Sequence, residues 1–334
     1  MRKLLAFVAF LVLGVILFSF VVRAVGWSEV WEAAGEFWGG KGLLLLIFTL
    51  LMLGAGALRW REILRHQGYY VPFSSLLKQY LGGFSLSFFF PMAFFGNELF
   101  RSYTLQEFHQ VPLPRAIVSV VVERILEVTM YLLLLGAGIA FLLISKSVLI
   151  PTLFWWILSG IGMLALALAF FYFKSHRKES IVRIFFPRLK GTNGFLEMEQ
   201  ELLRFFNLRN RAFWEGIFLS FAKVSFALLR TLVLVGFLGK FIGFFPAVAI
   251  TGFIFLSLLV PIPGQLGSHE ALQVLAFQSL GLEGHTGAAF AFLVRAAEFV
   301  FAFGGLILFF RLGASLFQRL MFSKVERLFQ KLFS

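Results

Sequence analysis

Long runs of apolar residues, separated by short polar segments, dominate the chain. A helix needs about 20 apolar residues to cross the roughly 30 Å hydrocarbon core of a bilayer, and apolar runs of this length favour transmembrane helices over buried strands. We therefore expect an all-α polytopic membrane protein. The runs that are long enough predict six full transmembrane helices, near 4–25, 42–58, 117–144, 149–173, 213–238 and 286–310.

Two further apolar segments, 73–97 and 246–282, are interrupted by Pro and Gly before polar residues begin. Irregular backbone at membrane depth is tolerated only where protein or a water-filled cavity satisfies its polar groups. The interruptions therefore predict two re-entrant hairpins of broken helices, whose new helix N-termini can face an anion. The residues expected to form the breaks are Pro91, Gly96, Asn97, Pro261, Pro263, Gly264 and Gly267.

The composition limits the chemistry that the chain can perform. Hydrophobic residues make up 60% of it and charged residues only 14%, and Cys and Asp are both absent. The absence of Cys excludes thiol catalysis and Cys-ligated metal, and without Asp there is no acidic cluster of the kind that holds Mg²⁺. We expect no metal and no cofactor, and we favour a role other than an enzyme.

The distribution of Lys and Arg predicts the orientation. The segments 59–78 and 174–212 and the tail from Arg311 are rich in Lys and Arg, whereas the loop 26–41 is acidic. Because basic loops stay on the cytoplasmic side, both termini are expected there, in the cytoplasmic membrane of a prokaryote. This rule also explains the net charge of +13 without nucleic acid as a partner. The cytoplasmic loop 174–212 predicts an amphipathic interfacial helix near 195–206.

One pattern of residues occurs twice. Pro91 is followed after seven residues by Glu98, and the sequence Arg-x-x-Glu begins 26 residues later, at Arg124. Pro263 is likewise followed by Glu270, and Arg-x-x-Glu begins 25 residues later, at Arg295. Together with the predicted topology, this favours an inverted repeat, as in transporters whose broken helices meet near the membrane midplane. We expect one domain over 1–334, with repeats at about 73–144 and 246–310.

The charged residues within the apolar runs are the candidate site. A charge at a helix centre costs about 2.5–3.5 kcal/mol even on insertion scales, so several of them predict a function. The alternative is structural, because Arg and Glu three residues apart can form a local ion pair. The candidate substrate-binding residues are Glu98, Arg101, Glu123, Arg124, Glu127, Arg230, Glu270, Arg295 and Glu298.

Four stretches resemble one family: FPMAFFGNELFR, VVVERILEVTMYLLL, LVPIPGQLGSHEAL and RAAEFVFAFGGLILFF. The chain is similar to the flippase-like membrane domain of the lysyl-phosphatidylglycerol synthetase family. The resemblance implies two re-entrant helices around a central cavity that moves a charged phospholipid or lipid-linked headgroup between leaflets. Fused members carry an aminoacyl-transferase domain that makes the lipid, and this chain does not match it. The chain departs from the family pattern at Asn97 and Gln265.

These observations predict a lipid flippase in which Arg124 and Arg295 hold the phosphate, because guanidinium groups pair with phosphate oxygens. The glutamates would pair these arginines in the empty site. The expected partner is an anionic or aminoacylated phospholipid; a homo-oligomer and a separate lipid synthase stay open. The alternatives are an intramembrane lipid-modifying enzyme with Glu98 and Glu270 as acid and base, and a membrane anchor for a cell-envelope lipid synthase.

Overall fold

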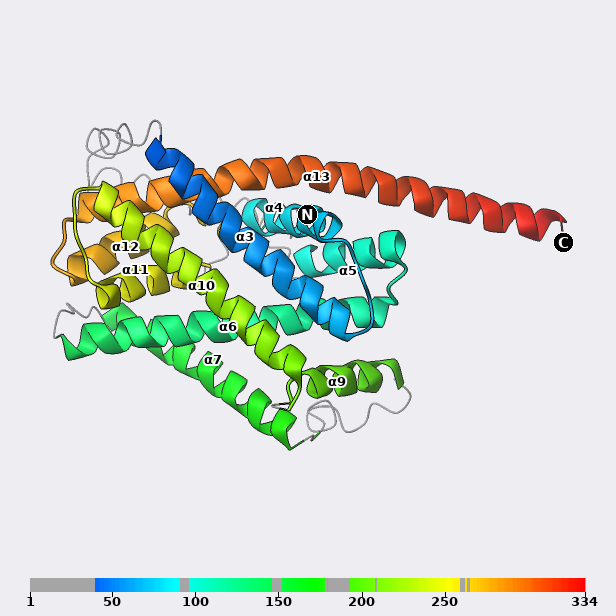
Figure 1. Ribbon diagram of the computed structural model, residues 1–334, viewed down its shortest axis with the longest axis horizontal. Coiled ribbons are helices and arrows are strands. Elements are labelled where there is room, and N and C mark those ends of the chain that lie inside the picture. Colours follow the sequence, from blue (N-terminus) through cyan, green and yellow to red (C-terminus); the bar gives the residue numbers. More distant parts are fainter. Residues whose placement is uncertain are drawn as a thin grey trace.

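The computed structural model describes residues 40–90, 96–145, 152–177, 179, 193–207, 209–258, 262 and 265–333. Within these residues the chain forms helices and contains no strand (Figure 1). The predicted fold class, an all-α polytopic membrane protein, is confirmed.

Four helices are long and apolar enough to cross a membrane: α3 (Gly40–His66), α6 (Leu113–Ile144), α10 (Arg211–Phe237) and the segment Gly284–Ala314 of α13 (Gly284–Phe333). With a rise of 1.5 Å per residue, a helix of 27 residues such as α3 is about 40 Å long. A fifth helix, α7 (Thr152–His176), covers most of the run 149–173. The run 4–25 lies outside the described residues.

In each interrupted segment, one helix ends before the interruption and another begins after it. The first holds α4 (Phe73–Phe89) and the start of α5 (Gly96–His109), and the second holds α11 (Phe244–Ser257) and α12 (Ser268–Ser279). Gly267 precedes α12 with a φ of 79°, a left-handed conformation that only glycine adopts without strain. Pro91, Pro261, Pro263 and Gly264 lie outside the described residues. That these pairs are re-entrant stays a prediction.

The same order of helices occurs twice, as α3–α4–α5–α6 and as α10–α11–α12–α13. The two sets interlock, because α4 packs against α13, α11 packs against α6, and α3 packs against α10 (Figure 1). At the α6–α11 crossing, a Cβ added to Gly138 would lie 2.7 Å from Ala249 Cα, so the two backbones are in close contact there. Inversion of one set relative to the other stays a prediction.

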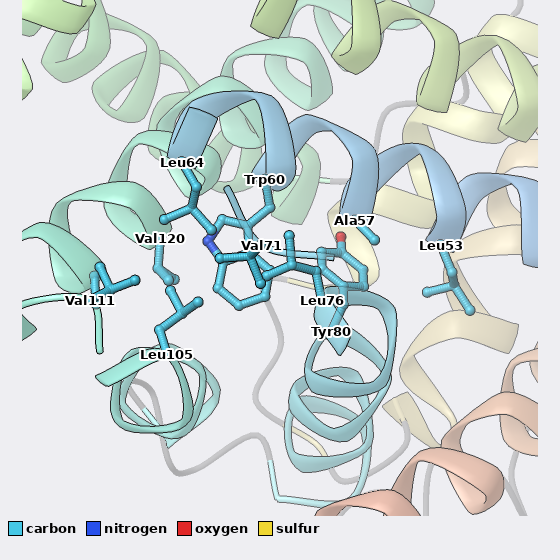
Figure 2. Packing of buried hydrophobic residues seen from close by; sticks show 11 residues of the cluster. Leu53, Ala57, Trp60, Leu64, Val71, Leu76, Tyr80, Leu105, Val111 and Val120 are labelled. Carbon is cyan, nitrogen blue, oxygen red and sulfur yellow. The ribbon is translucent and has the colours of Figure 1, made fainter. Parts of the chain in front are cut away.

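The apolar core of the first set surrounds Trp60 of α3. Its neighbours include Leu76 and Tyr80 of α4 and Leu105 of α5, all well buried (Figure 2). The Trp60 indole N–H donates to Ser119 Oγ of α6 at 3.1 Å, so its polar group is satisfied inside the core. This packing fixes α3, α4, α5 and α6 around the charged residues described below.

The predicted amphipathic helix is present as α9 (Asn193–Phe205). It packs against α6 and α7, and Phe205 is buried beside Leu126 of α6. One face of α9 therefore belongs to the core of the bundle.

Candidate functional site

Helix α6 carries the centre of a charged network. Glu123 and Glu127 are four residues apart and so lie on the same face of the helix. Both are buried, as are their cationic partners from α3, α5 and α10. A buried charge needs a partner of opposite charge or hydrogen bonds that replace water.

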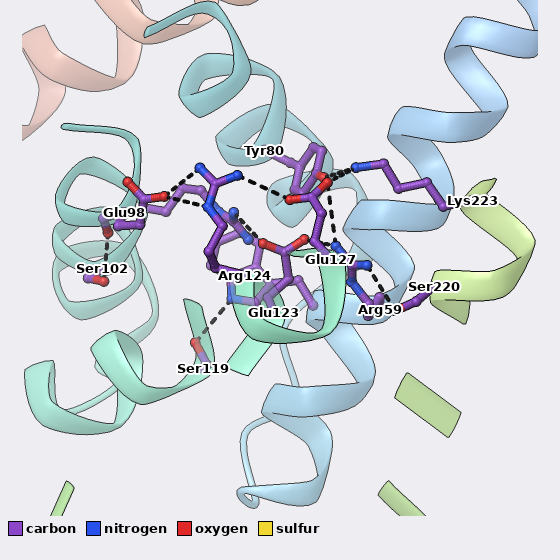
Figure 3. A network of polar contacts seen from close by, with 12 residues as sticks. Arg59, Tyr80, Glu98, Ser102, Ser119, Glu123, Arg124, Glu127, Ser220 and Lys223 are labelled. Atoms are coloured by element: carbon purple, nitrogen blue, oxygen red, sulfur yellow. Dashed lines mark hydrogen bonds and ion pairs between the residues drawn. The ribbon is translucent and has the colours of Figure 1, made fainter. Parts of the chain in front are cut away.

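Glu123 joins two arginines from different helices, and Figure 3 shows one of them, Arg59, beside it. Arg59 of α3 pairs with Glu123 and also donates to Ser220 of α10 at 2.9 Å. Arg101 of α5 donates to the second oxygen of Glu123 at 3.1 Å. The Arg101 guanidinium also lies 4.0 Å from the ring centroid of Trp60, within the range of a cation–π contact. One carboxylate thus pairs with a cation from α3 and a cation from α5.

Glu127 links the two halves of the chain. Lys223 of α10 pairs with Glu127 and donates to Tyr80 Oη at 3.2 Å. The Tyr131 hydroxyl donates at 2.6 Å to Glu127 Oε1, the oxygen that Lys223 also contacts. Because Lys223 belongs to the second set of helices and Glu127 to the first, this ion pair crosses the boundary between them.

Arg124 bridges two glutamates. It donates to Glu98 Oε1 at 2.7 Å and to Glu127 Oε2 at 3.3 Å (Figure 3). The other oxygen of Glu98 is buried and has no hydrogen-bond partner among the described residues. The Arg-x-x-Glu sequence of the first half thus forms its local pair, and α5 adds a second carboxylate.

The second half repeats the pair between Glu and Arg. Arg295 of α13 donates to Glu270 Oε2 of α12 at 2.6 Å and to the carbonyl of Gln265 at 2.7 Å. Glu270 Oε2 also accepts the Gly267 N–H at 2.8 Å, so a carboxylate of the chain occupies the N-terminus of α12. The pair Glu270–Arg295 therefore corresponds to Glu98–Arg124.

Arg230 of α10 completes the arrangement. It donates to Glu298 of α13 at 3.2 Å and to Thr49 of α3 at 3.2 Å. Its Nε atom is buried without a partner among the described residues. Glu298 pairs with Arg230 and Arg295 pairs with Glu270, so the structural alternative of a local Arg295–Glu298 ion pair is not what the second half forms.

Both halves line one central cavity of about 160 Å³. On this measure it has room for roughly ten water molecules. Four cationic and three carboxylate side chains line it: Arg101, Arg124, Lys223, Arg230, Glu123, Glu127 and Glu298. Counting each as fully ionised gives a net charge of +1. The cavity therefore offers both signs of charge in a membrane-spanning bundle, with a small excess of cations.

The family model described as the lysylphosphatidylglycerol synthase TM region matches residues 5–305 of the chain. The chain belongs to this family. It is also similar to a UPF0104 membrane protein of Methanocaldococcus jannaschii, with 24% identity over 272 residues that cover 77% of this chain and 80% of the relative. The resemblance seen in the four sequence stretches is therefore confirmed.

The candidate residues of this family member fall into two groups. Six of the nine line the cavity: Arg101, Glu123, Arg124, Glu127, Arg230 and Glu298. The other three, Glu98, Glu270 and Arg295, belong to the ion pairs beside it. Gly96 and Asn97 begin α5, and Asn97 also lines the cavity. The described residues contain no group of three or more His, Cys, Asp or Glu side chains that could hold a metal ion.

Two residues of the charged network were not predicted from the sequence. Arg59 was counted with the basic segment 59–78, but it lies inside α3, with 1% of its surface exposed, and pairs with Glu123. That interpretation was wrong because α3 continues beyond the apolar run to His66. Lys223 lies within the run 213–238, and the rule that singled out Arg230, a charge within an apolar run, applies to it equally.

Proposed function

We propose that the protein moves a charged phospholipid headgroup between the two leaflets through the central cavity. The observation that carries this proposal is the meeting of ionised side chains from both halves at one cavity. Such residues are costly inside a membrane and are characteristic of substrate pathways. The family to which the chain belongs is named for a lipid-related membrane region, which supports a lipid as the substrate.

The phosphate would bind where guanidinium donors are free. Arg101 has two buried nitrogens, Nε and Nη2, and Arg230 has one, Nε, without partners among the described residues. Guanidinium groups match phosphate oxygens with paired donors. Arg101 comes from the first set of helices and Arg230 from the second, so a phosphate in the cavity would be held from both sides. Arg124 adds a third cation at the edge.

The carboxylates would keep the empty cavity stable. Glu123 holds Arg101 and Glu298 holds Arg230 at distances of 3.1 and 3.2 Å. A phosphate that binds the free nitrogens of these arginines need not break the pairs. Because the lining carries a net charge of +1 when every side chain is ionised, one phosphate monoanion would bring the occupied cavity to neutrality. The lipid is anionic or aminoacylated in this proposal, and the protein lies in the cytoplasmic membrane with both termini inside.

We favour transport over lipid modification because Glu98 and Glu270 are each held in a separate ion pair, with Arg124 and Arg295 respectively. Neither glutamate is among the residues that line the central cavity. An acid and base pair would need both groups within hydrogen-bond reach of one substrate.

The test is lipid movement in proteoliposomes. Fluorescent phosphatidylglycerol is incorporated in both leaflets, and a membrane-impermeant reductant bleaches only the outer leaflet unless the lipid moves. The wild-type protein should give near-complete bleaching. The double variant Arg101→Gln, Arg230→Gln loses charged hydrogen bonds worth about 1.5–3 kcal/mol each, so the rate should fall at least about tenfold.

The matched control is Arg211→Ala. Arg211 begins α10, its side chain is 87% exposed and it does not line the cavity. Each protein is first checked for its melting transition in detergent, and Arg101→Lys, which keeps the charge, serves as a second variant. Equal rates for wild type, control and double variant would remove the proposed role of the cavity, and no movement with wild-type protein would remove flipping of this lipid class.

A further inference from the structure

A second hollow lies between α5 and α6, beside the central cavity. It has a volume of about 580 Å³. Seven residues line it: Glu98, Leu99, Ser102, Ile117, Val121, Arg124 and Ile125. We call this hollow the α5–α6 groove. The chemistry of its lining decides which ligand it can bind.

Most of the α5–α6 groove is apolar. Ile117, Val121 and Ile125 follow each other at intervals of four residues and form a stripe along one face of α6. Two helical turns separate the first from the last, about 12 Å. Leu99 of α5 lines the groove opposite them and is 48% exposed. An exposed apolar groove between a helix long enough to span the membrane, α6, and its neighbour α5 fits a hydrocarbon chain.

The α5–α6 groove also carries charge, at the level of Ile125 on α6. Glu98 and Arg124 form an ion pair there, and Arg124 lines both the α5–α6 groove and the central cavity. Glu98 keeps one buried oxygen without a hydrogen-bond partner among the described residues. Arg124 of this ion pair thus lines both the groove and the central cavity.

The corresponding pair of the second half is enclosed. The side chain of Arg295 is 12% exposed and that of Glu270 is 4% exposed, whereas that of Arg124 is 44% exposed. Arg295 and Glu270 also have backbone partners, Gln265 and Gly267. In this structure the first-half pair is therefore the one that a ligand in the surrounding lipid can reach.

We propose that the α5–α6 groove is the lateral entrance for the lipid. An acyl chain lies along the stripe of Ile117, Val121 and Ile125 while the phosphate contacts Arg124. Opening the Glu98–Arg124 pair then lets the headgroup pass into the central cavity. This inference rests on the proposed function, since it names the route by which that lipid reaches the cavity. The occupant is a phospholipid, because the groove places the guanidinium of Arg124 beside an apolar channel, and a phosphate can replace Glu98 as the partner of that guanidinium.

The proposal is tested by direct labelling, which does not require transport. The full-length protein is placed in phosphatidylcholine vesicles that contain phosphatidylglycerol with a photoactivatable acyl chain, and the labelled peptides are mapped by mass spectrometry. Labelling should concentrate on the groove residues of α5 and α6. Val121→Trp fills the groove, and displacing about two chain methylenes should reduce labelling there about tenfold.

The matched control is Leu133→Trp, on the same helix. Leu133 is 62% exposed and does not line the groove. It should leave the labelling of the groove unchanged. Equal labelling of the groove in both tryptophan variants, or labelling spread evenly over all lipid-facing helices of the wild type, would overturn the proposal.

Transport measured on the same variants separates this inference from the proposed function. A wild-type protein that moves lipid and a Val121→Trp variant that moves it equally fast would reject the entrance while leaving the flippase intact. Labelled groove residues in a protein that moves no lipid would support a lipid site there and reject transport. Slowed movement in Val121→Trp but not in Leu133→Trp supports both.

Discussion

Replacing Glu123 by Gln should destabilise the protein strongly. Glu123 is the carboxylate that faces both Arg59 and Arg101, and all three side chains are almost fully buried. Gln keeps the size of the side chain and can still accept a hydrogen bond, so the change removes the charge with little change in packing. Two buried guanidinium groups then lose their nearest negative charge.

The structure sets the size of the expected loss. Breaking a buried ion pair by removing one partner costs about 3–5 kcal/mol. Arg59 keeps Glu127 at 3.9 Å and Ser220 at 2.9 Å. Arg101 keeps its cation–π contact with Trp60 at 4.0 Å, and such contacts are worth up to about 2 kcal/mol when desolvated. We therefore expect a loss near the lower limit, about 3 kcal/mol.

The assay is reversible unfolding in mixed micelles, followed by far-ultraviolet circular dichroism and by tryptophan fluorescence, because Trp60 lies beside Arg101. Glu215→Gln is the control, since Glu215 pairs with Arg211 and His66 at the surface. An exposed pair contributes less than about 1 kcal/mol. A loss as small as that for Glu123→Gln would mean that the Arg59–Glu123–Arg101 group behaves like a surface ion pair, and would refute the account of it as a buried charged network.

Two further predictions concern packing and the pair between the halves. Gly138→Ala should destabilise the protein by about 1–3 kcal/mol, because the added methyl group overpacks against Ala249 at the α6–α11 crossing. Gly136→Ala is the control: nothing lies within 4 Å of its added Cβ, so it should be neutral or stabilising by up to about 1 kcal/mol. If the two variants changed the thermal midpoint equally, the close approach of α6 and α11 would be contradicted. Lys223→Met should lower the free energy of unfolding by about 3 kcal/mol, because Glu127 loses a buried cationic partner. In a double-mutant cycle, adding Glu127→Leu should recover part of that loss. Strictly additive effects of the two substitutions would argue against coupling between Lys223 and Glu127.

The sequence indicated much of the fold because apolar length and interruption are local properties. The runs that predict α3, α6, α10 and α13 are each long enough to span a bilayer on their own. The repeated spacing also singled out Glu98, Arg124, Glu270 and Arg295 as candidate residues, and the structure joins them as the ion pairs Glu98–Arg124 and Glu270–Arg295.

The remaining site depended on contacts between distant residues. Arg59 follows an apolar run and precedes other basic residues, so its sequence context is that of a loop. Its partners Glu123 and Ser220 are 64 and 161 residues away and come close only when α3 crosses α6 and α10. The close approach at Gly138 has the same origin, because the sequence does not reveal which glycine faces another backbone.

Binding of lipid to the purified protein tests the central claim most directly. Native mass spectrometry can compare phospholipid retained by the wild type, by Arg101→Gln from the first half and by Arg230→Gln from the second. If both halves hold one phosphate, each single substitution lowers the retained anionic phospholipid by about tenfold or more, while Arg211→Ala retains it. Retention that is unchanged in both cavity variants would contradict the assignment of the shared cavity to a lipid headgroup.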